Sequence, residues 1–493
     1  LWARNPGAWR QLDWSSPSSA SACYFKYHPK VTVETDGLRM SGGRSIAKVG
    51  KDAPDDRPNL YLLVEESFRE LDARMIVAAH AFADGWDVTV GQQWWFFENF
   101  GRLKPGVALF KGNNDIQAHN MGLAKRAGHH VASLEEEAFG LVDFGGQRLY
   151  ADGIAQVCDL FLVQGEVQER FLIQQVGVPA TRVAITGNPR VDILRPEYRQ
   201  ANEKKAAELR DQFGKFVLVN TNFASINPFD HDACNYFDRC VQVGVIDPDI
   251  AADVEAFHDW CAWERANFTE LLSLIGRLTD GGAAIPLIIR PHPSENHAPW
   301  HQTFAGREHV TIIEDPDYTS WILASQAMAH TGCTTGLEAY LLGVPSVSVQ
   351  PAKSSWNGNV LSNEVNQTAS TAELAEQMLR DQLAGKATIA LNSKDAGKRL
   401  RPHLVTDPQT PAARHIVQAL EHLAADLDPC RIQDPQSDFA LENTARQLKK
   451  AAVDEADFNE RWFELAVLLG LKNSPKANFL APSVARLTAG RMS

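Results

Sequence analysis

The 493-residue sequence lacks the features of a secreted, membrane-spanning or nucleic-acid-binding protein. No apolar run approaches the roughly 20 residues that a membrane-spanning helix needs. No signal peptide is recognisable at the N-terminus. The net charge of −13 disfavours a general nucleic-acid binder, which carries an excess of Lys and Arg. We therefore expect a cytoplasmic protein with no nucleic-acid partner, with peripheral contact at the inner membrane through a basic stretch at residues 446–450.

Cysteine and metal-binding patterns are also scarce. The seven cysteines are scattered, odd in number and without a CxxC pair. This spacing is typical of neither a disulfide framework nor a zinc site, so we expect reduced thiols. No Asp-x-Asp motif follows a strand, because Asp247-Pro-Asp249 precedes a helical pattern and is typical of a cap. The sequence thus predicts no metal and no cofactor.

Apolar strands alternate with amphipathic helices along most of the chain. The first strand is expected at Asn59–Val64, and a helical pattern follows at Phe68–Asp84. After a charged helical segment that we interpret as a hinge, a second series begins at Phe216–Asn220. Such alternation with short connections predicts parallel sheets with helices on both faces. We expect an α/β protein of two Rossmann-like domains facing a cleft, with a C-terminal helical extension.

These patterns divide the chain into four expected regions. They are an irregular leader at 1–58, an N-terminal Rossmann-like domain at 59–205, a C-terminal Rossmann-like domain at 206–411, and a helical tail at 412–493.

Polar residues cluster where the predicted strands end. Ligands of open α/β sheets bind beyond the carboxyl ends of the strands, so these residues are candidates for a site between the sheets. In the first series they include Glu65, Glu66, Arg69, Lys111, Asn113, Glu135, Glu136, Glu137, Asn188, Arg190 and Asp192. In the second series they include Asn220, Thr221, Asn222, Asn227, Arg290, His292, His330 and Thr331.

Two acidic features have both a structural and a chemical interpretation. The run Glu135-Glu136-Glu137 could be a solvated charge run, yet it directly follows the strand Val131–Leu134, so at least one carboxylate should face the cleft. A carboxylate crowded by like charges can have a raised pKa and act as an acid or a base. Asp192 could equally cap a helix start, since Asp is a favoured capping residue.

The stretch Pro286–Val349 contains two strand-to-helix loops. In the first, His292 lies between prolines, where it either shapes a turn or donates to a phosphate or carboxylate. In the second, Thr331 and Thr334 precede the helix that carries Glu338, where they either cap the helix or bind an anion through the same N–H groups. We hypothesise that these loops bind the phosphate end of an activated nucleotide.

Six motifs in order resemble a known family. They are Tyr61-Leu-Leu-Val-Glu-Glu-Ser-Phe-Arg69-Glu70-Leu-Asp72, Leu134-Glu-Glu-Glu-Ala138, Gly187-Asn-Pro-Arg-Val-Asp192, Val219-Asn-Thr-Asn-Phe223, Arg290-Pro-His-Pro-Ser-Glu295, and His330-Thr-Gly-Cys-Thr-Thr335 with Gly343-Val-Pro345. Together they resemble the bacterial surface carbohydrate biosynthesis proteins, a family that includes the retaining β-Kdo glycosyltransferases of lipopolysaccharide and capsule assembly. The resemblance implies a GT-B-like fold and a glycosyltransferase that uses a CMP-activated 2-keto sugar acid.

The resemblance also implies roles for individual residues. The N-terminal domain would provide the acceptor side and the catalytic carboxylates, with Asp192 as nucleophile and Glu136, beside Glu137, as acid/base; the reverse assignment stays open. The C-terminal domain would bind the nucleotide sugar, because the His-Pro motif is similar to one that contacts CMP in bacterial sialyltransferases. The implied donor-binding residues are Arg190, Asn220, Asn222, Arg290, His292, Pro293, Glu295, His330, Thr331, Cys333, Thr334 and Glu338.

The sequence departs from the family pattern at two places. Ala138 stands where the carboxylate motif usually has glycine, and Pro228 follows Asn227 where a histidine is expected. Another nonulosonic acid is therefore an alternative to Kdo. A UDP-sugar or CDP-polyol donor and a non-catalytic nucleotide-sugar-binding module are further alternatives. The expected partners are the CMP-activated donor, a glycan or lipid-linked acceptor, and other glycosyltransferase domains.

Overall fold

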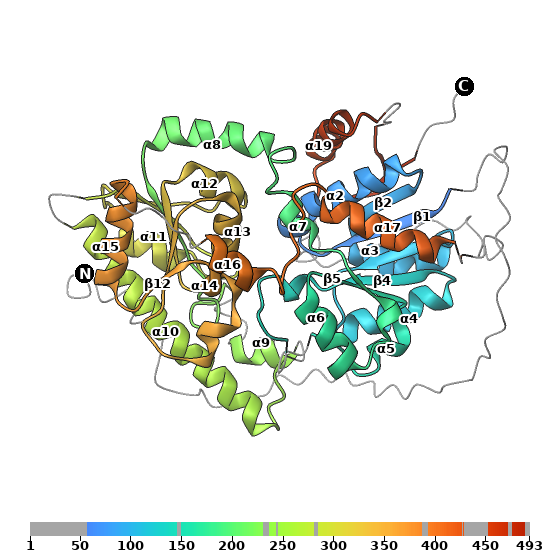
Figure 1. Ribbon diagram of the computed structural model, residues 1–493, viewed down its shortest axis with the longest axis horizontal. Helices are drawn as coiled ribbons and strands as arrows, with labels where there is room; N and C mark the ends of the chain where they lie inside the picture. The colour runs from blue at the N-terminus through green and yellow to red at the C-terminus, as the bar shows by residue number, and fades with distance from the viewer. Residues whose placement is uncertain are drawn as a thin grey trace.

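Two β-sheets, each covered by helices, lie side by side in the described part of the chain (Figure 1). The computed structural model describes residues 57–144, 149–229, 236–242, 245–280, 284–386, 393–425, 427, 452–471 and 476–488. Within these residues one sheet has the strand order β13-β14-β2-β1-β3-β4-β5-β6 and the other β12-β11-β10-β7-β8-β9. The expected two Rossmann-like domains are confirmed. Nearly all of the predicted leader at 1–58 lies outside the described residues, as does the basic stretch at 446–450.

The N-terminal sheet contains six parallel strands and is enclosed by helices. Its parallel strands are β1 (Asn59–Val64), β2 (Asp87–Gln92), β3 (Val107–Phe110), β4 (His130–Leu134), β5 (Leu160–Val163) and β6 (Val183–Ile185). The helices between them are α2 (Ser67–Ala83), α3 (Gln93–Asn99), α4 (Asp115–Arg126), α5 (Ile154–Val157), α6 (Glu166–Phe171) and, after β6, α7 (Pro189–Asp192).

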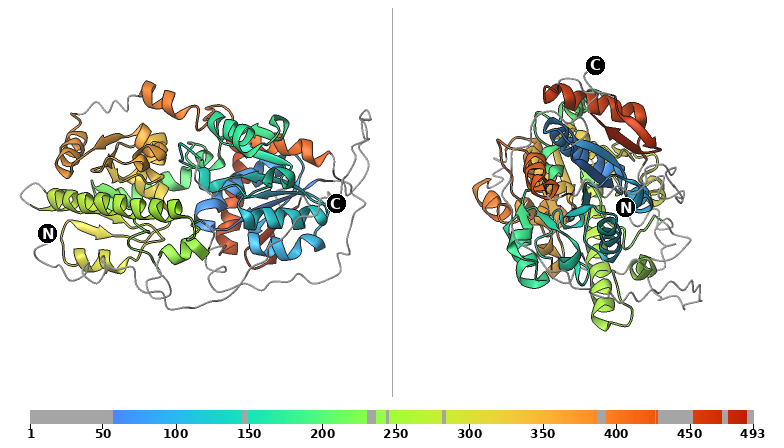
Figure 2. Two further views of the ribbon diagram at one scale, coloured as in Figure 1. Left: turned by 90° about the horizontal axis from the view of Figure 1, so that it is seen from below. Right: turned by 90° about the vertical axis from the view of Figure 1, so that its right-hand side faces the viewer.

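The C-terminal sheet is parallel throughout its described strands. They are β7 (Val217–Asn220), β8 (Leu287–Arg290), β9 (Val310–Ile312), β10 (Ala327–His330), β11 (Ser346–Val349) and β12 (Gln367–Ala369). The surrounding helices are α8 (Gln200–Phe213), α9 (Tyr236–Gln242), α10 (Ala251–Thr279), α11 (Ala298–Phe304), α12 (Tyr318–Ala324), α13 (Thr335–Leu342), α14 (Leu361–Val365), α15 (Ala372–Leu383) and α16 (Ser393–Leu400). Figure 2 shows α10 as the long helix running along this half.

Burial on both faces explains why the strands appear in the sequence as continuous apolar runs. In β1, Leu60 and Leu62 belong to one core cluster, whereas Tyr61 and Leu63 belong to the cluster on the opposite face. Successive side chains of a strand point to opposite faces, so both sets must be apolar when helices cover both sides. Each fully buried Leu contributes roughly 1.5–3 kcal/mol.

The C-terminal tail packs onto the N-terminal domain. Helix α17 (Ala412–Ala424) packs against α2, β3 and β4, and α19 (Glu455–Leu468) packs against α2. Besides these expected helices, the tail contains a hairpin that the prediction of a helical tail missed. Its strands are β13 (Asn478–Ala481) and β14 (Val484–Leu487), and β14 pairs antiparallel with β2.

Two features allow the hairpin to dock. Ser483 has a φ of 60°, the left-handed conformation that lets the chain turn between the two strands. A Cβ on Gly91 would lie 2.6 Å from the carbonyl oxygen of Ser483, so only glycine allows this approach of β14 to β2.

The two domains are joined by direct contacts near the end of β4. The amide of Leu361 donates to the carbonyl of Gly140 (2.8 Å), and the amide of Val142 donates to the carbonyl of Asn359 (3.1 Å). Phe139 packs in one buried cluster with residues of α13, α14 and α16. The predicted boundary at 205/206 falls inside α8, which packs against α12 of the C-terminal domain.

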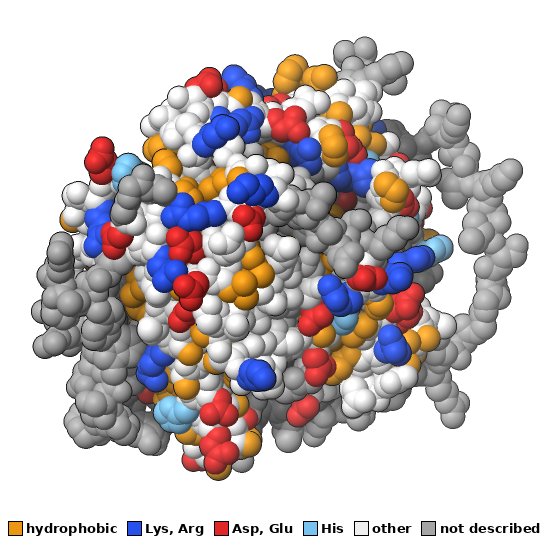
Figure 3. All heavy atoms as spheres, turned by 60° about the vertical axis from the view of Figure 1, so that its left-hand side comes forward, with side chains coloured by type: hydrophobic (Ala, Val, Ile, Leu, Met, Phe, Trp, Pro, Cys, Tyr) orange, Lys and Arg blue, Asp and Glu red, His pale blue; other side chains and the backbone are white. Residues whose placement is uncertain are grey.

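The surface of the described chain has mixed character. On the face drawn in Figure 3, Lys and Arg side chains are interspersed with Asp and Glu. Across the described residues, no helix combines the length and the apolar character that crossing a bilayer requires.

Candidate functional site

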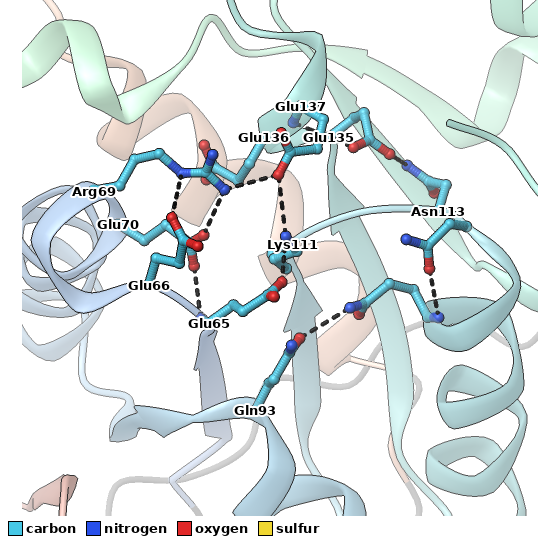
Figure 4. Close-up of polar contacts among 12 residues, drawn as sticks. Glu65, Glu66, Arg69, Glu70, Gln93, Lys111, Asn113, Glu135, Glu136 and Glu137 are labelled. Carbon is cyan, nitrogen blue, oxygen red and sulfur yellow. Dashed lines mark hydrogen bonds and ion pairs between the residues drawn. The ribbon is translucent and has the colours of Figure 1, made fainter. Parts of the chain in front are cut away.

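Charged side chains meet at the carboxyl ends of β1, β3 and β4 (Figure 4). Lys111, directly after β3, forms ion pairs with Glu65 (2.5 Å) and Glu137 (3.3 Å). Arg69, in the first turn of α2, donates to Glu137 at 2.8 Å. We call Glu65, Arg69, Lys111 and Glu137 the charged network. It forms because the carboxyl ends of parallel strands lie at one edge of the sheet.

Glu137 is the accessible carboxylate of the charged network. Its side chain is 46% exposed, yet two cations contact it. The Arg69 guanidinium, and after it the Lys111 ammonium, hold the pKa of this carboxyl far below its usual range. Glu137 is therefore ionised and fixed in direction at any physiological pH.

Glu136 lies on the inner side of the same loop. Its side chain is buried and forms an ion pair with the equally buried Arg74 of α2 (3.2 Å). Its amide donates to the carbonyl of Lys111 (2.9 Å). These contacts make Glu136 the counter-ion of Arg74 and attach the loop to the helix. The proposed acid/base role of Glu136 stays a prediction.

Glu135 differs from both of its neighbours. It accepts hydrogen bonds from the side-chain amide of Asn113 (2.9 Å) and from the backbone amide of Glu137 (3.3 Å). Burial raises the pKa of Glu135 to about 7. A Cβ on Gly112 would come within 3.2 Å of its Oε1, so glycine leaves room beside this carboxyl. A carboxyl with this pKa can gain and lose a proton near neutral pH.

Asp192 contacts a different element. Its two oxygens accept from the amides of Ala412 (2.9 Å) and Ala413 (2.7 Å), at the first turn of α17. Burial raises its pKa to about 6. Asp192 does not cap a helix that starts at its own position, because it is the last residue of α7. It binds instead the first turn of α17, 220 residues away in sequence. Each oxygen of Asp192 thus already accepts one hydrogen bond, and the residue is buried.

Two residues assigned to the donor bind each other across the domains. Arg190, at the start of α7, forms a buried ion pair with Glu338 of α13 (2.9 Å). The Arg190 guanidinium also lies over the ring of Phe139, 4.3 Å from its centroid. This link fixes the separation of the two domains.

Glu295 organises the loops after β7 and β8. It is fully buried and accepts from the Thr221 hydroxyl (2.5 Å), the Phe223 amide (3.1 Å) and the Trp300 indole (3.0 Å). The amide of His292 also donates to it (3.2 Å). Glu295 therefore supports the His-Pro loop from within.

The His292 ring lies where the two domains meet. Burial and Arg290 lower the pKa of His292 to about 4, and the charges of Glu66 and Arg69 in the N-terminal domain also act on it. Its Nδ1 accepts from the Ser294 amide (3.1 Å), so the ring is neutral with a fixed direction. At this junction of the two domains, His292 lies within electrostatic range of Glu66 and Arg69.

The remaining donor candidates fall into two groups. Arg290 donates to the carbonyls of Asp315 (2.8 Å) and Pro316 (3.3 Å), and His330 is fully buried behind α13 with its Nδ1 accepting from Gly332 (3.1 Å). The residues at the loop ends are Asn220, Thr331 and Cys333, which are buried, Asn222 and Thr334, which are half-buried, and Pro293, which is exposed.

The loop before α13 approaches the N-terminal domain closely. A Cβ on Gly140 would lie 3.0 Å from Cγ2 of Thr334, and Gly140 has a φ of 84°. The start of α13 therefore lies beside the segment that follows Glu135–Glu137.

Arg69 and Lys111 were predicted as candidates for a site between the sheets, but no catalytic or donor-binding role was predicted for either. Their pairing with Glu137 depends on the fold, because they lie 68 and 26 residues from it in sequence. Arg74 gave no signal, because nothing in the sequence pairs a mid-helix arginine with Glu136. Among the described residues, no group of three His, Cys, Asp or Glu side chains is placed to bind a metal ion.

No protein-family model and no curated protein matches this chain. Among solved structures, the chain is similar to UDP-GlcNAc 2-epimerase from Methanocaldococcus jannaschii, with a TM-score of 0.47 and 12% identity over 74% of this chain and 99% of the other. It is also similar to a putative UDP-N-acetylglucosamine 2-epimerase from Listeria monocytogenes, with a TM-score of 0.47 and 13% identity over 77% of this chain and 99% of the other. A third similar structure is the wall teichoic acid polymerase TagF, with a TM-score of 0.42 and 8% identity over 76% of this chain and 90% of the other. These likenesses concern the fold alone.

Proposed function

We propose that this protein is a glycosyltransferase of bacterial surface polysaccharide assembly. It transfers Kdo or a related 2-keto sugar acid from a CMP-activated donor to a glycan or lipid-linked acceptor. The observation that carries the proposal is the junction of the two domains, where the segment that follows Glu137, an ionised and accessible carboxylate with two bound cations, lies beside the start of α13. The six family-like motifs supply the substrate class.

The donor phosphate is assigned to the C-terminal side of the junction. The neutral His292 ring is a candidate donor through Nε2, and the loop before α13 offers backbone N–H groups at a helix start.

Transfer with retention requires two displacements. In the first, a carboxylate oxygen bonds to the anomeric carbon while the bond from that carbon to the CMP phosphate oxygen breaks, and CMP leaves with the electron pair. In the second, the acceptor oxygen bonds to the anomeric carbon, the ester bond to the enzyme breaks, and the acceptor proton passes to a base. The products are the glycoside and the regenerated carboxylate.

Two carboxylates are candidates for the nucleophile. The resemblance favours Asp192. The exposure and the ionised state of the Glu137 side chain favour Glu137 instead, whereas both oxygens of Asp192 accept hydrogen bonds from α17. Glu135 suits the base in the second displacement, since its pKa of about 7 lets it accept a proton at neutral pH.

Intact-protein mass spectrometry with CMP-Kdo tests the mechanism. We expect a covalent glycosyl adduct that Glu137→Gln abolishes and Asp192→Asn preserves. The opposite result would assign the nucleophile to Asp192. An adduct that survives both substitutions would refute both assignments.

Thermal unfolding with CMP, CDP and UDP tests the donor class. Binding to the folded state alone raises the unfolding temperature, and we expect CMP to give the largest rise. Stabilisation by UDP or CDP without CMP would replace the donor with a UDP-sugar or CDP-polyol. Tight nucleotide binding with no transfer from any donor would favour a non-catalytic binding module.

A further inference from the structure

Two buried glutamate side chains accept hydrogen bonds from the loop after β7, residues 221–227. Glu295 accepts hydrogen bonds from the first half of the loop, from the Thr221 hydroxyl and the Phe223 backbone amide. Glu264, on α10, accepts hydrogen bonds from the second half of the loop, from both the backbone amide (3.3 Å) and the hydroxyl of Ser225. Both side chains are almost inaccessible to solvent, with residue exposures of 0% and 2%.

Burying two carboxylates at one place opposes folding unless donors compensate. Burial raises the pKa of Glu264 to about 8, and the nearby Glu295 contributes to this rise. The donors that offset this cost come largely from the loop itself, so the carboxylates and the loop fix one another.

The loop is also joined to the His-Pro loop. The His292 amide donates to the Thr221 hydroxyl (3.1 Å), the Asn296 amide donates to the Asn227 carbonyl (2.9 Å), and the Asn227 side chain donates back to the Asn296 carbonyl (2.9 Å). The segments after β7 and β8 therefore form a single unit, and a shift at residue 225 is transmitted to the His292 loop.

We infer that Glu264 is a positioning residue for the nucleotide donor, acting through Ser225 and the 221–227 loop. The inference rests on the proposed function, because the loop bears the donor candidate Asn222. Glu264 does not belong to the family-like motifs. It lies on the long helix α10 and follows no strand directly in the sequence.

Trp263, which precedes Glu264 on α10, connects this helix to a segment that contacts the N-terminal domain. The Trp263 indole donates to Asn357 (2.5 Å), and two residues later the Asn359 carbonyl accepts from the amide of Val142. Val142 follows the Glu135–Glu137 loop by five residues. The same part of α10 thus contacts the 221–227 loop and, through Asn357, the segment that pairs with Val142 of the N-terminal domain.

Three variants test the inference. Glu264→Met keeps the size of the side chain but accepts no hydrogen bond, whereas Glu264→Gln keeps one acceptor oxygen, which suffices because both Ser225 contacts use Oε2. The matched control is Glu270→Met. Glu270 lies on the same helix and accepts from a backbone amide, that of Ala372, away from the loop.

The readouts are nucleotide affinity by titration calorimetry with CMP, CDP and UDP, and hydrogen exchange of the Phe223 and Ser225 amides. For Glu264→Met we expect affinity to fall about tenfold, consistent with the loss of one to two hydrogen bonds, and exchange at Ser225 to become faster. Glu264→Gln should restore affinity to within about twofold. Glu270→Met should change neither readout.

Unchanged affinity in Glu264→Met, or an equal loss in Glu270→Met, would overturn the inference. If the wild type binds none of the three nucleotides, the proposed function fails, and the exchange rates at Phe223 and Ser225 alone decide whether Glu264 fixes the loop. If Glu264→Met does not fold, Ser225→Ala replaces it, because that change removes the hydroxyl contact and leaves the carboxylate in place.

Discussion

Substitutions in the ion pair between Arg74 and Glu136 can show whether Glu136 has a structural or a catalytic role. Both side chains are almost fully buried, at 0% and 1% exposure, and lie 3.2 Å apart. Replacing Glu136 with Ala leaves the arginine charge buried without its counter-ion, which costs about 3–5 kcal/mol. For a domain of this size we expect the unfolding temperature to fall by roughly 6–20 °C.

The double variant Arg74→Met with Glu136→Leu provides the decisive comparison. Replacing a buried ion pair by apolar residues of similar volume is often neutral or stabilising, so most of the lost stability should return. If Glu136 serves only as the counter-ion, sugar transfer by the double variant returns as well. Calorimetry and a transfer assay on the same samples check both points. An unchanged unfolding temperature in Glu136→Ala would refute the structural reasoning, and a stable but inactive double variant would restore Glu136 as acid/base.

Three further predictions concern other parts of the molecule. Asp192→Ala should lower the free energy of unfolding by about 1–2 kcal/mol in urea, because α17 loses its cap; no change would contradict that role. Glu135 has a folded-state pKa of about 7 against a usual value of 4.5, so its contribution to stability is complete below pH 4.5 and is lost as pH rises to about 7. Glu135→Gln should therefore gain stability relative to the wild type across this pH range, and parallel pH profiles would argue against the shift. Gly91→Ala should displace the β13–β14 hairpin, because its Cβ would meet Ser483; faster hydrogen exchange at β14 would report it, and unaltered exchange would show that the hairpin adjusts.

The sequence was sufficient to predict the strands because parallel strands buried on both faces must be continuously apolar. Asn59–Val64 and Val217–Asn220 are such runs, and both are strands. The hairpin at 478–487 was missed because its two strands have four residues each and are stabilised by pairing with β2, a contact between distant parts of the sequence. No local pattern encodes that pairing.

The sequence predicted which polar residues follow the strands, but it could not predict which partners they contact. The run Glu135–Glu137 follows β4 as expected, yet its three carboxylates have different environments because α2 and β3 supply different partners to each. Only the folded chain shows that Glu136 faces Arg74 while Glu137 faces the junction. For Asp192 the local signal for a cap was wrong, because Asp192 ends α7 and its carboxylate binds the first turn of α17, a contact that only the tertiary structure shows.

The hairpin has a consequence for biosynthesis. Strand β14 covers an edge of the N-terminal sheet, and a contact such as that between Gln92 and Pro482 joins residues 390 positions apart. At a synthesis rate of about 5–20 residues per second, the edge of β2 stays uncovered for roughly 20–80 s after it leaves the ribosome. An uncovered edge strand can pair with other chains, so the nascent protein should depend on chaperones during this interval.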